Sequence, residues 1–188
     1  MNAKNILVPT IILTVITLVV TALLVLTNGV TKDRIAELKV QAEEAAKKEV
    51  LPAAGSFTEV IFDTGIDGEE IIYYKADNGA GYVFSTSSKG YGGTVAVMTG
   101  ITSAGEIAGI TITSQNETPG LGQKALNTSF TDQYRMAIPD GGIRVTKSGN
   151  SADNEIDAIA GATITTNAVT NAVNEAINIY HEIVGGGN

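Results

Sequence analysis

The sequence predicts an α+β protein in which a single N-terminal transmembrane helix precedes an extracytoplasmic domain with an antiparallel sheet and packed helices. Three observations lead to this prediction. They are an uncharged apolar segment near the N-terminus, a series of short β-rich runs in the middle of the chain, and a helical apolar pattern near the C-terminus. Roughly 130 residues follow the juxtamembrane region, which is the usual size of one domain with one core.

The apolar segment covers residues 6–26 and contains Ile, Leu, Val, Ala and Thr with one proline and no charge. About 20 residues at 1.5 Å each cross a hydrocarbon core of about 30 Å, so the segment is long enough to span a membrane. A cleaved signal peptide is the alternative, but its apolar part is usually about 7–15 residues long and ends at an A-x-A site, and we find no convincing site of that kind. We predict that residues 1–30 form a tail and a transmembrane helix.

Charges around the span predict its orientation in the cell (inner) membrane. Lys4 and the amino group precede the span and favour a cytoplasmic N-terminus, which places the remainder outside the cytoplasm. Lys32 and Arg34 follow the span with Asp33 between them, so the charge bias is weak. Lipidation does not supply the anchor, because the chain has no cysteine and no glycine at position 2.

Composition excludes several functions. The net charge of −8 and the absence of a basic patch argue against nucleic-acid binding. Without cysteine the chain has no disulfide, no thiolate iron–sulfur cluster, no c-type haem attachment and no cysteinyl flavin. The single histidine, His181, cannot form a His-rich metal site alone, and no Ser-His-Asp arrangement is plausible. A redox function would therefore need an organic cofactor.

Helix-forming Ala, Glu, Lys and Leu without Pro or Gly fill residues 31–50, which predicts a juxtamembrane helix continuing from the span. Pro52 and Gly55 end that helix, so we predict a domain over residues 51–184. The glycines of residues 185–188 predict a flexible tail.

Within the domain, β-rich runs bounded by Gly, Asp, Asn or Ser predict strands at 58–62, 70–75, 81–86, 94–101 and 107–113. Hairpin turns are expected at residues 77–79 and 103–105. A short helix is expected at 127–136, with further strands at 143–147 and 156–160. Helical spacing from Asn167 joins Val169, Val173, Ile177, Tyr180 and Val184. This face predicts an amphipathic helix that packs on the sheet.

Two glycine-rich loops lie between these elements. Residues 89–93 read KGYGG, and residues 115–124 read QNETPGLGQK. Missing Cβ atoms let such backbones pass close to a ligand or to another chain, although each loop alone is more often only a turn.

The segment DAIAGATIT, residues 157–165, precedes the C-terminal helix. Gly161 and Ala162 keep side-chain bulk away from Thr163, and the start of the helix presents free N–H groups and a positive dipole end to an anion. Thr165 or Thr166 is expected to cap the helix. For this segment alone, a polar helix cap without a ligand is the alternative.

The chain resembles the FMN-binding domain family in four features that follow one another in the same order. They are the apolar span, GYGG, ETPGLG and D-x-x-x-G-A-T-x-T. That family includes the G subunit of the Rnf ferredoxin:NAD+ oxidoreductase and the C subunit of the sodium-pumping NADH:quinone oxidoreductase. The resemblance implies FMN joined covalently to Thr163 through a phosphoester. A threonine hydroxyl is a poor nucleophile, so attachment should need a separate flavin transferase. Asp157 matches an aspartate expected to be recognised by that transferase, and Ala160 departs from the Ser or Thr usual before the glycine.

The expected cofactor-binding residues come from the two later motifs. They are Thr163, Gly161, Ala162, Thr165, Glu117, Thr118, Gly120, Leu121 and Gly122. We expect no metal ligand and no catalytic residue acting on a separate substrate, because paired acid and base groups are not evident.

The resemblance implies an electron-carrying subunit of a membrane-bound, ion-translocating oxidoreductase complex, with other membrane, iron–sulfur and flavin subunits as partners. The compact length is similar to that of the Rnf G subunit, whereas the sodium-pump C subunit is typically longer. Three alternatives stay open: that C subunit, a membrane-anchored flavin module that feeds another extracytoplasmic reductase, and a cofactor-free anchored interaction domain.

Overall fold

The computed structural model describes residues 3–63, 70–147, 149 and 152–185. The chain divides into two compact units, Met1–Glu43 and Glu44–Asn188, which are described separately. The predicted flexible tail falls almost entirely on residues 186–188, which lie outside the described residues.

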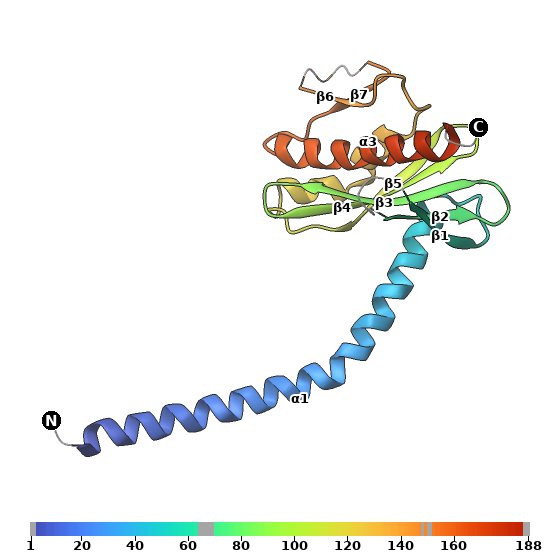
Figure 1. Ribbon diagram of the computed structural model, residues 1–188. Coiled ribbons are helices and arrows are strands. Elements are labelled where there is room, and N and C mark those ends of the chain that lie inside the picture. The colour runs from blue at the N-terminus through green and yellow to red at the C-terminus, as the bar shows by residue number, and fades with distance from the viewer. Residues whose placement is uncertain (1–2, 64–69, 148, 150–151, 186–188) are drawn as a thin grey trace. The chain divides into compact units, whose positions relative to one another are not determined.

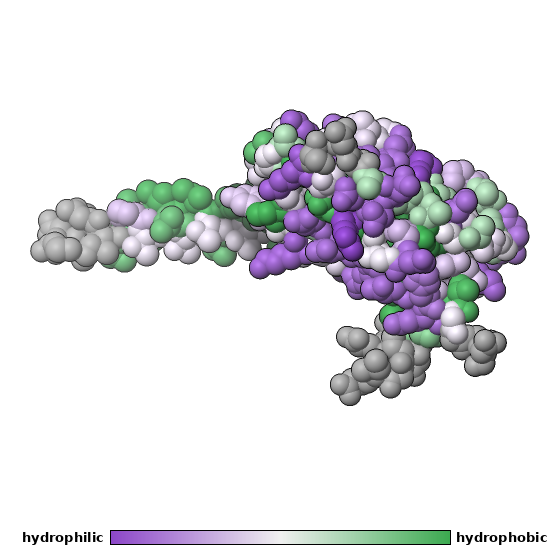
Figure 2. Space-filling view, turned by 90° about the horizontal axis from the view of Figure 1, so that it is seen from above, coloured by the Kyte–Doolittle hydropathy of each residue, from purple (hydrophilic) through white to green (hydrophobic). Residues whose placement is uncertain are grey.

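Helix α1 (Ala3–Val50) is a single helix of 48 residues, as the apolar span and the helix-forming segment after it predict. It is the one helix in the described ranges that is long and apolar enough to cross a membrane, with a mean hydropathy of 2.6 over its most apolar window. None of that window is buried in the protein, and Figure 2 shows green apolar residues along it. Such a surface is stable in lipid rather than in water.

Threonines within the apolar part of α1 are compatible with lipid. The hydroxyls of Thr14, Thr17 and Thr27 each donate to the backbone carbonyl four residues earlier, at 2.8–2.9 Å. Because a hydrocarbon core offers no water, hydroxyls there have to be satisfied internally. These bonds remove the main polar cost of placing threonine in a membrane-spanning helix.

A five-stranded antiparallel sheet forms the centre of the second unit (Figure 1). Its strands, in spatial as well as chain order, are β1 (Phe57–Asp63), β2 (Glu70–Ala76), β3 (Gly81–Lys89), β4 (Thr94–Thr102) and β5 (Ile107–Ser114). All five predicted strands are confirmed. The two predicted hairpin turns are also present, closed by hydrogen bonds from Gly79 N–H to Ala76 O and from Gly105 N–H to Thr102 O.

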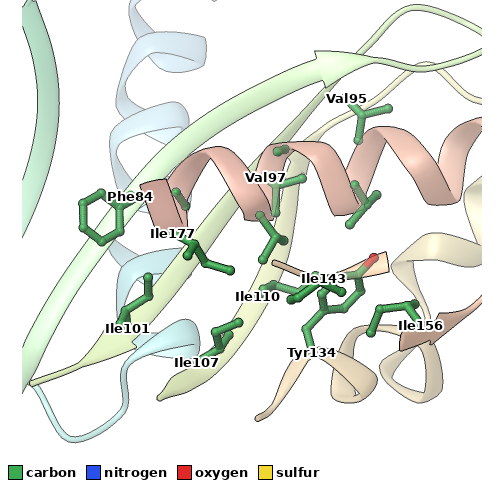
Figure 3. Packing of buried hydrophobic residues seen from close by; sticks show 14 of the residues in the cluster. Phe84, Val95, Val97, Ile101, Ile107, Ile110, Tyr134, Ile143, Ile156 and Ile177 are labelled. Atoms are coloured by element: carbon green, nitrogen blue, oxygen red, sulfur yellow. The ribbon is translucent and has the colours of Figure 1, made fainter. Parts of the chain in front are cut away.

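Helix α3 (Thr163–Gly185) covers one face of this sheet (Figure 1). Its apolar stripe is buried as predicted, apart from Val184, which is exposed near the helix end. Figure 3 shows Ile177 of this helix among core side chains that include Phe84, Val97 and Ile110. The α+β class is therefore confirmed, and this packing fixes the position of α3 on the sheet.

The opposite face of the sheet receives the last turns of α1. Val50 and Leu51 are each 1% exposed and pack in a second core cluster with Val83 and Met98. The ammonium of Lys47 lies 3.5 Å from the centre of the Tyr74 ring, a favourable cation–π contact. The end of the predicted juxtamembrane helix is thus part of the core of the second unit.

The segment between the sheet and α3 differs from the prediction. The expected helix at 127–136 is divided into α2 (Thr128–Thr131) and the 3₁₀ turn η2 (Asp132–Tyr134), preceded by η1 (Gly122–Leu126). The two further strands, β6 (Arg144–Thr146) and β7 (Glu155–Asp157), form a separate parallel pair. β7 ends at Asp157 rather than at residue 160, because the chain turns there toward the start of α3.

A matched pair of buried threonines gives a stability prediction. Within the described part of the chain, the Thr99 hydroxyl is buried without a hydrogen-bond partner, whereas the Thr86 hydroxyl donates to Ala172 O at 2.8 Å. Thr99→Val should raise the free energy of unfolding by about 1 kcal/mol, and Thr86→Val should lower it by about the same amount. Thermal unfolding in detergent, followed by circular dichroism, measures both. Equal shifts in the two variants would contradict the assignment.

Candidate cofactor site

Three segments that are distant in sequence meet around one open cavity of about 600 Å³ in the second unit. This volume lies within the range of roughly 300–1,000 Å³ that small-molecule sites occupy. The lining residues are Tyr91, Glu117, Thr118, Leu121, Gly122, Gly161, Ala162, Thr163, Ile164 and Thr165. The cavity therefore brings together most of the residues expected to bind a cofactor.

Thr163 is the first residue of α3 and is half-buried at the cavity wall. A tight turn precedes it, closed by a hydrogen bond of 2.9 Å from Ala162 N–H to Ile159 O. Gly161 has a φ of +77° in this turn, a left-handed conformation that favours glycine. The glycine in the signature thus sets the direction in which the chain enters the helix and presents Thr163.

Backbone donors at the start of α3 lie beside Thr163. The first helical hydrogen bond runs from Thr166 N–H to Ala162 O at 3.0 Å. The N–H groups of Thr163, Ile164 and Thr165 therefore precede the first turn of bonds, and no acceptor for them is found among the described residues. Such a helix start attracts an anion through both its N–H groups and its dipole.

The predicted cap by Thr165 or Thr166 is wrong, because the helix already begins at Thr163 and Ala162 stands before it. Thr166 instead stabilises the turn from within the helix: its hydroxyl accepts from Ile159 N–H and donates to Ala162 O, both at 3.1 Å. Since no side chain in the described part of the chain caps the helix, its first N–H groups stay available to a ligand.

Glu117 links the three segments through its carboxylate. Its Oε2 accepts from the Thr165 hydroxyl at 2.6 Å, and its Oε1 accepts from Gly92 N–H at 2.9 Å. The side chain is 4% exposed, and both oxygens act as acceptors. Charge-assisted hydrogen bonds of this kind are roughly twice as strong as neutral ones. One buried carboxylate thus fixes the GYGG loop and the start of α3 relative to the ETPGLG loop.

The glycines around Glu117 lie so close to other atoms of the chain that a side chain would not fit at these positions. A Cβ on Gly90 would lie 2.4 Å from Glu117 Oε1, and a Cβ on Gly122 would lie 2.6 Å from Glu117 Oε2. A Cβ on Gly92 would lie 2.0 Å from the backbone oxygen of Asn116. The two glycine-rich loops therefore pack on each other and on the carboxylate, and no side chain fits between them.

Two of the residues singled out from the sequence lie outside the cavity wall. Gly120, with a φ of +75°, shapes the exposed turn between Thr118 and Leu121. Asp157 ends β7, where its N–H donates to Gln133 Oε1 at 2.8 Å. The Oδ1 atom of Asp157 is buried without a hydrogen-bond partner in the part of the chain that the structure describes.

Two lining residues, Tyr91 and Ile164, were not predicted. Tyr91 stands between glycines of the first loop, and Ile164 is the variable residue of the G-A-T-x-T signature. Ile164 could have been predicted, because it is an apolar residue at the start of the helix that does not belong to the buried stripe. Glu117 is the only charged residue in the lining, and the described residues contain no cluster of three metal-ligating side chains.

Comparison with known proteins identifies two regions of the chain. The model of the FMN-binding domain matches residues 90–178, and the model of the RnfG N-terminal region matches residues 1–50. The G subunit of the Na+-translocating ferredoxin:NAD+ oxidoreductase complex of Acetobacterium woodii is 39% identical over 187 residues, covering 92% of this chain and 90% of that protein. The G subunit of the ion-translocating oxidoreductase complex of Methanosarcina acetivorans is 33% identical, covering 87% and 88%.

Solved structures support the fold. The C subunit of the Na+-translocating NADH-quinone reductase of Parabacteroides distasonis superposes with a TM-score of 0.53 at 24% identity, covering 63% of this chain and 64% of that chain. NqrC of Shewanella oneidensis gives a TM-score of 0.52 at 18% identity, covering 70% and 67%. The matches to curated relatives extend over both the apolar helix and the domain with the cavity. The chain therefore belongs to the family of G subunits of ion-translocating oxidoreductase complexes of the Rnf type, and it contains an FMN-binding domain.

Proposed function

We propose that this chain is an electron-carrying subunit of an ion-translocating ferredoxin:NAD+ oxidoreductase complex and that its FMN is joined to Thr163 by a phosphoester. The observation that carries the proposal is the position of the Thr163 hydroxyl, at the wall of a cavity and beside the unpaired N–H groups that begin α3. The G subunits that resemble this chain over most of its length support the same role.

The residues present fit FMN. The N–H groups of Thr163, Ile164 and Thr165 suit a phosphate diester, whose charge is negative. Leu121 and Ile164 offer apolar surface to a flavin ring. Bound there, FMN would supply reversible acceptance and donation of electrons. The chain itself would bind and orient the group, since the lining residues that the structure describes include no acid–base pair for a separate substrate.

Attachment would require a flavin transferase. No side chain among the described residues hydrogen-bonds to the Thr163 hydroxyl, so none of these residues activates it as a nucleophile. In the proposed reaction the hydroxyl oxygen forms a bond to the flavin-bearing phosphorus of a flavin dinucleotide. The pyrophosphate P–O bond of the dinucleotide breaks, the nucleoside monophosphate leaves, and a base of the transferase receives the hydroxyl proton. Thr163 is only half-buried, which leaves its oxygen accessible to a second protein.

Asp157 is proposed as a recognition residue for that transferase. Its Oδ1 has no hydrogen-bond partner among the described residues and is buried, so the proposed recognition requires the segment around it to open. Asp157→Asn should therefore reduce the extent of flavin attachment without unfolding the domain. Flavin fluorescence of the denatured chain, after co-expression with a flavin transferase, measures the effect. Asp153→Asn, an exposed position on the same connection, is the matched control and should be modified normally.

We further propose that residues 1–30 anchor the chain in the cell membrane, with the N-terminus in the cytoplasm and the domain over residues 51–184 outside it. The absence of cysteine makes labelling simple. An impermeant maleimide should label Ser103→Cys in intact cells and should label Asn2→Cys only after lysis. The reverse pattern would contradict the orientation.

The test of the function as a whole is purification of the full chain from a host that expresses the complex and a flavin transferase. The denatured chain should fluoresce as a flavoprotein, and the native chain should co-purify with other membrane subunits. A colourless chain would favour a cofactor-free interaction domain. A flavinylated chain that purifies alone would favour a flavin module that feeds another reductase.

A further inference from the structure

Tyr91 differs from the other tyrosines of this chain. All six tyrosines are described, and five are buried or half-buried, whereas Tyr91 is 74% exposed and lines the cavity that contains Thr163. Leu121 and Ile164, which line the same cavity, are 44% and 54% exposed. Single exposed apolar residues are normal on a protein surface. Three of them from three separate segments around one cavity form an apolar binding surface.

The loop that carries Tyr91 is held in place. Gly90 N–H donates to Gly93 O at 2.8 Å, and Gly92 N–H donates to Glu117 Oε1. The same carboxylate accepts from Thr165, in the first turn of the helix that begins with Thr163. The backbone on both sides of Tyr91 is therefore fixed relative to the proposed attachment residue, and the exposed tyrosine side chain lies at the cavity.

A planar aromatic group is the ligand that suits this arrangement. Aromatic rings gain about 0.5–1.5 kcal/mol by offset stacking or edge contact beyond the area they bury. On the basis of the proposed attachment at Thr163, we propose that the ring of Tyr91 stacks on the flavin ring of that FMN and that Leu121 and Ile164 line the remainder of the ring site. Tyr91 is thus a positioning residue that holds the flavin on its own domain.

Stacking by a tyrosine has an optical consequence that does not depend on enzyme turnover. An excited flavin ring in contact with a phenol takes one electron from it, and the electron then returns to the phenol, so the energy is lost without emission. Flavin bound beside Tyr91 should therefore fluoresce weakly in the native protein and brightly after denaturation releases the contact.

The experiment compares variants of the full-length flavinylated chain in detergent at equal flavin content, determined on the denatured chain. Tyr91→Leu should increase native flavin fluorescence several-fold. Tyr91→Trp should keep it quenched, because indole also stacks and donates an electron. Tyr91→Phe should brighten the flavin yet retain the visible circular dichroism of the unchanged protein, since the ring remains. Leu126→Ala removes an exposed apolar side chain outside the cavity and should change nothing.

Equal native fluorescence in Tyr91→Leu and the unchanged protein would overturn the stacking proposal while leaving the attachment intact. Brightening by Tyr91→Trp equal to that of Tyr91→Leu would also overturn it, because a merely structural effect on the loop would act alike in both. Absence of flavin from the unchanged chain itself would overturn the attachment at Thr163 and the stacking with it. The flavin content of the denatured chain separates these failures.

Discussion

Thr163→Ala is expected to yield a folded protein with no covalently bound flavin. Thr163 lines the cavity, and its hydroxyl makes no hydrogen bond to the rest of the described chain, so removing the hydroxyl breaks no contact that stabilises the fold. The free energy of unfolding should change by less than about 0.5 kcal/mol, as for other substitutions outside the core. In-gel flavin fluorescence of the denatured chain measures attachment, and thermal unfolding measures stability.

Thr163→Ser is the matched control, because it retains a hydroxyl at the start of α3 and should retain flavin. Two other threonines line the cavity, Thr118 and Thr165. Thr165 is a poor alternative acceptor, since its hydroxyl is buried and donates to Glu117. Flavin fluorescence that survives in Thr163→Ala would move the attachment to another residue, and Thr118→Ala in the same background would then identify it.

Local patterns in the sequence predict most of the fold. Alternating apolar residues and the Gly and Asn turns between them give the five strands of the sheet in their order, because each hairpin pairs neighbours along the chain. The apolar stripe of α3 is visible for the same reason. The apolar pattern does not predict where α3 begins, because the residues of its first turn contact Glu117 and the preceding turn rather than the sheet.

The contacts that build the site could not be predicted from the sequence in the same way. Glu117 bonds to residues 25 positions before it and 48 positions after it, and no local periodicity reports such pairings. The glycines at positions 90, 92 and 122 indicate that the backbone passes close to a ligand or to another part of the chain. Their partner is the chain itself, because the loops pack on each other around the carboxylate. The glycine-rich motifs therefore predict where the site lies, but they do not predict the hydrogen bonds through which Glu117 joins its segments.

Glu117→Ala is expected to have the largest effect on the site of any single substitution in its wall. It leaves the Thr165 hydroxyl and Gly92 N–H without their acceptor and opens a void between the two glycine loops. Losing a buried charged acceptor of two hydrogen bonds costs roughly 3 kcal/mol. The melting temperature should fall accordingly, and flavin attachment should decrease because the start of α3 is no longer held against the loops.

Glu117→Gln separates the charge of this side chain from its shape. The amide fills the same space and accepts one of the two hydrogen bonds, so the destabilisation should be about half that of Glu117→Ala. Glu117 is the only charged residue among the described residues of the cavity wall, so the substitution also removes their one negative charge beside the proposed flavin. Reduction adds negative charge to a flavin, and a neighbouring carboxylate opposes it.

The flavin potential in Glu117→Gln should therefore rise, by an amount on the order of 30–60 mV for a pair of charges separated by several ångströms near the protein surface. Spectroelectrochemistry of the flavinylated chain measures the change. Glu106→Gln, which removes an exposed carboxylate outside the cavity, should leave the potential unchanged. A lowered or unaltered potential in Glu117→Gln would show that the carboxylate only joins the loops. A raised potential would give Glu117 a second role. The carboxylate that holds the cavity together would then also set the potential at which the flavin accepts electrons.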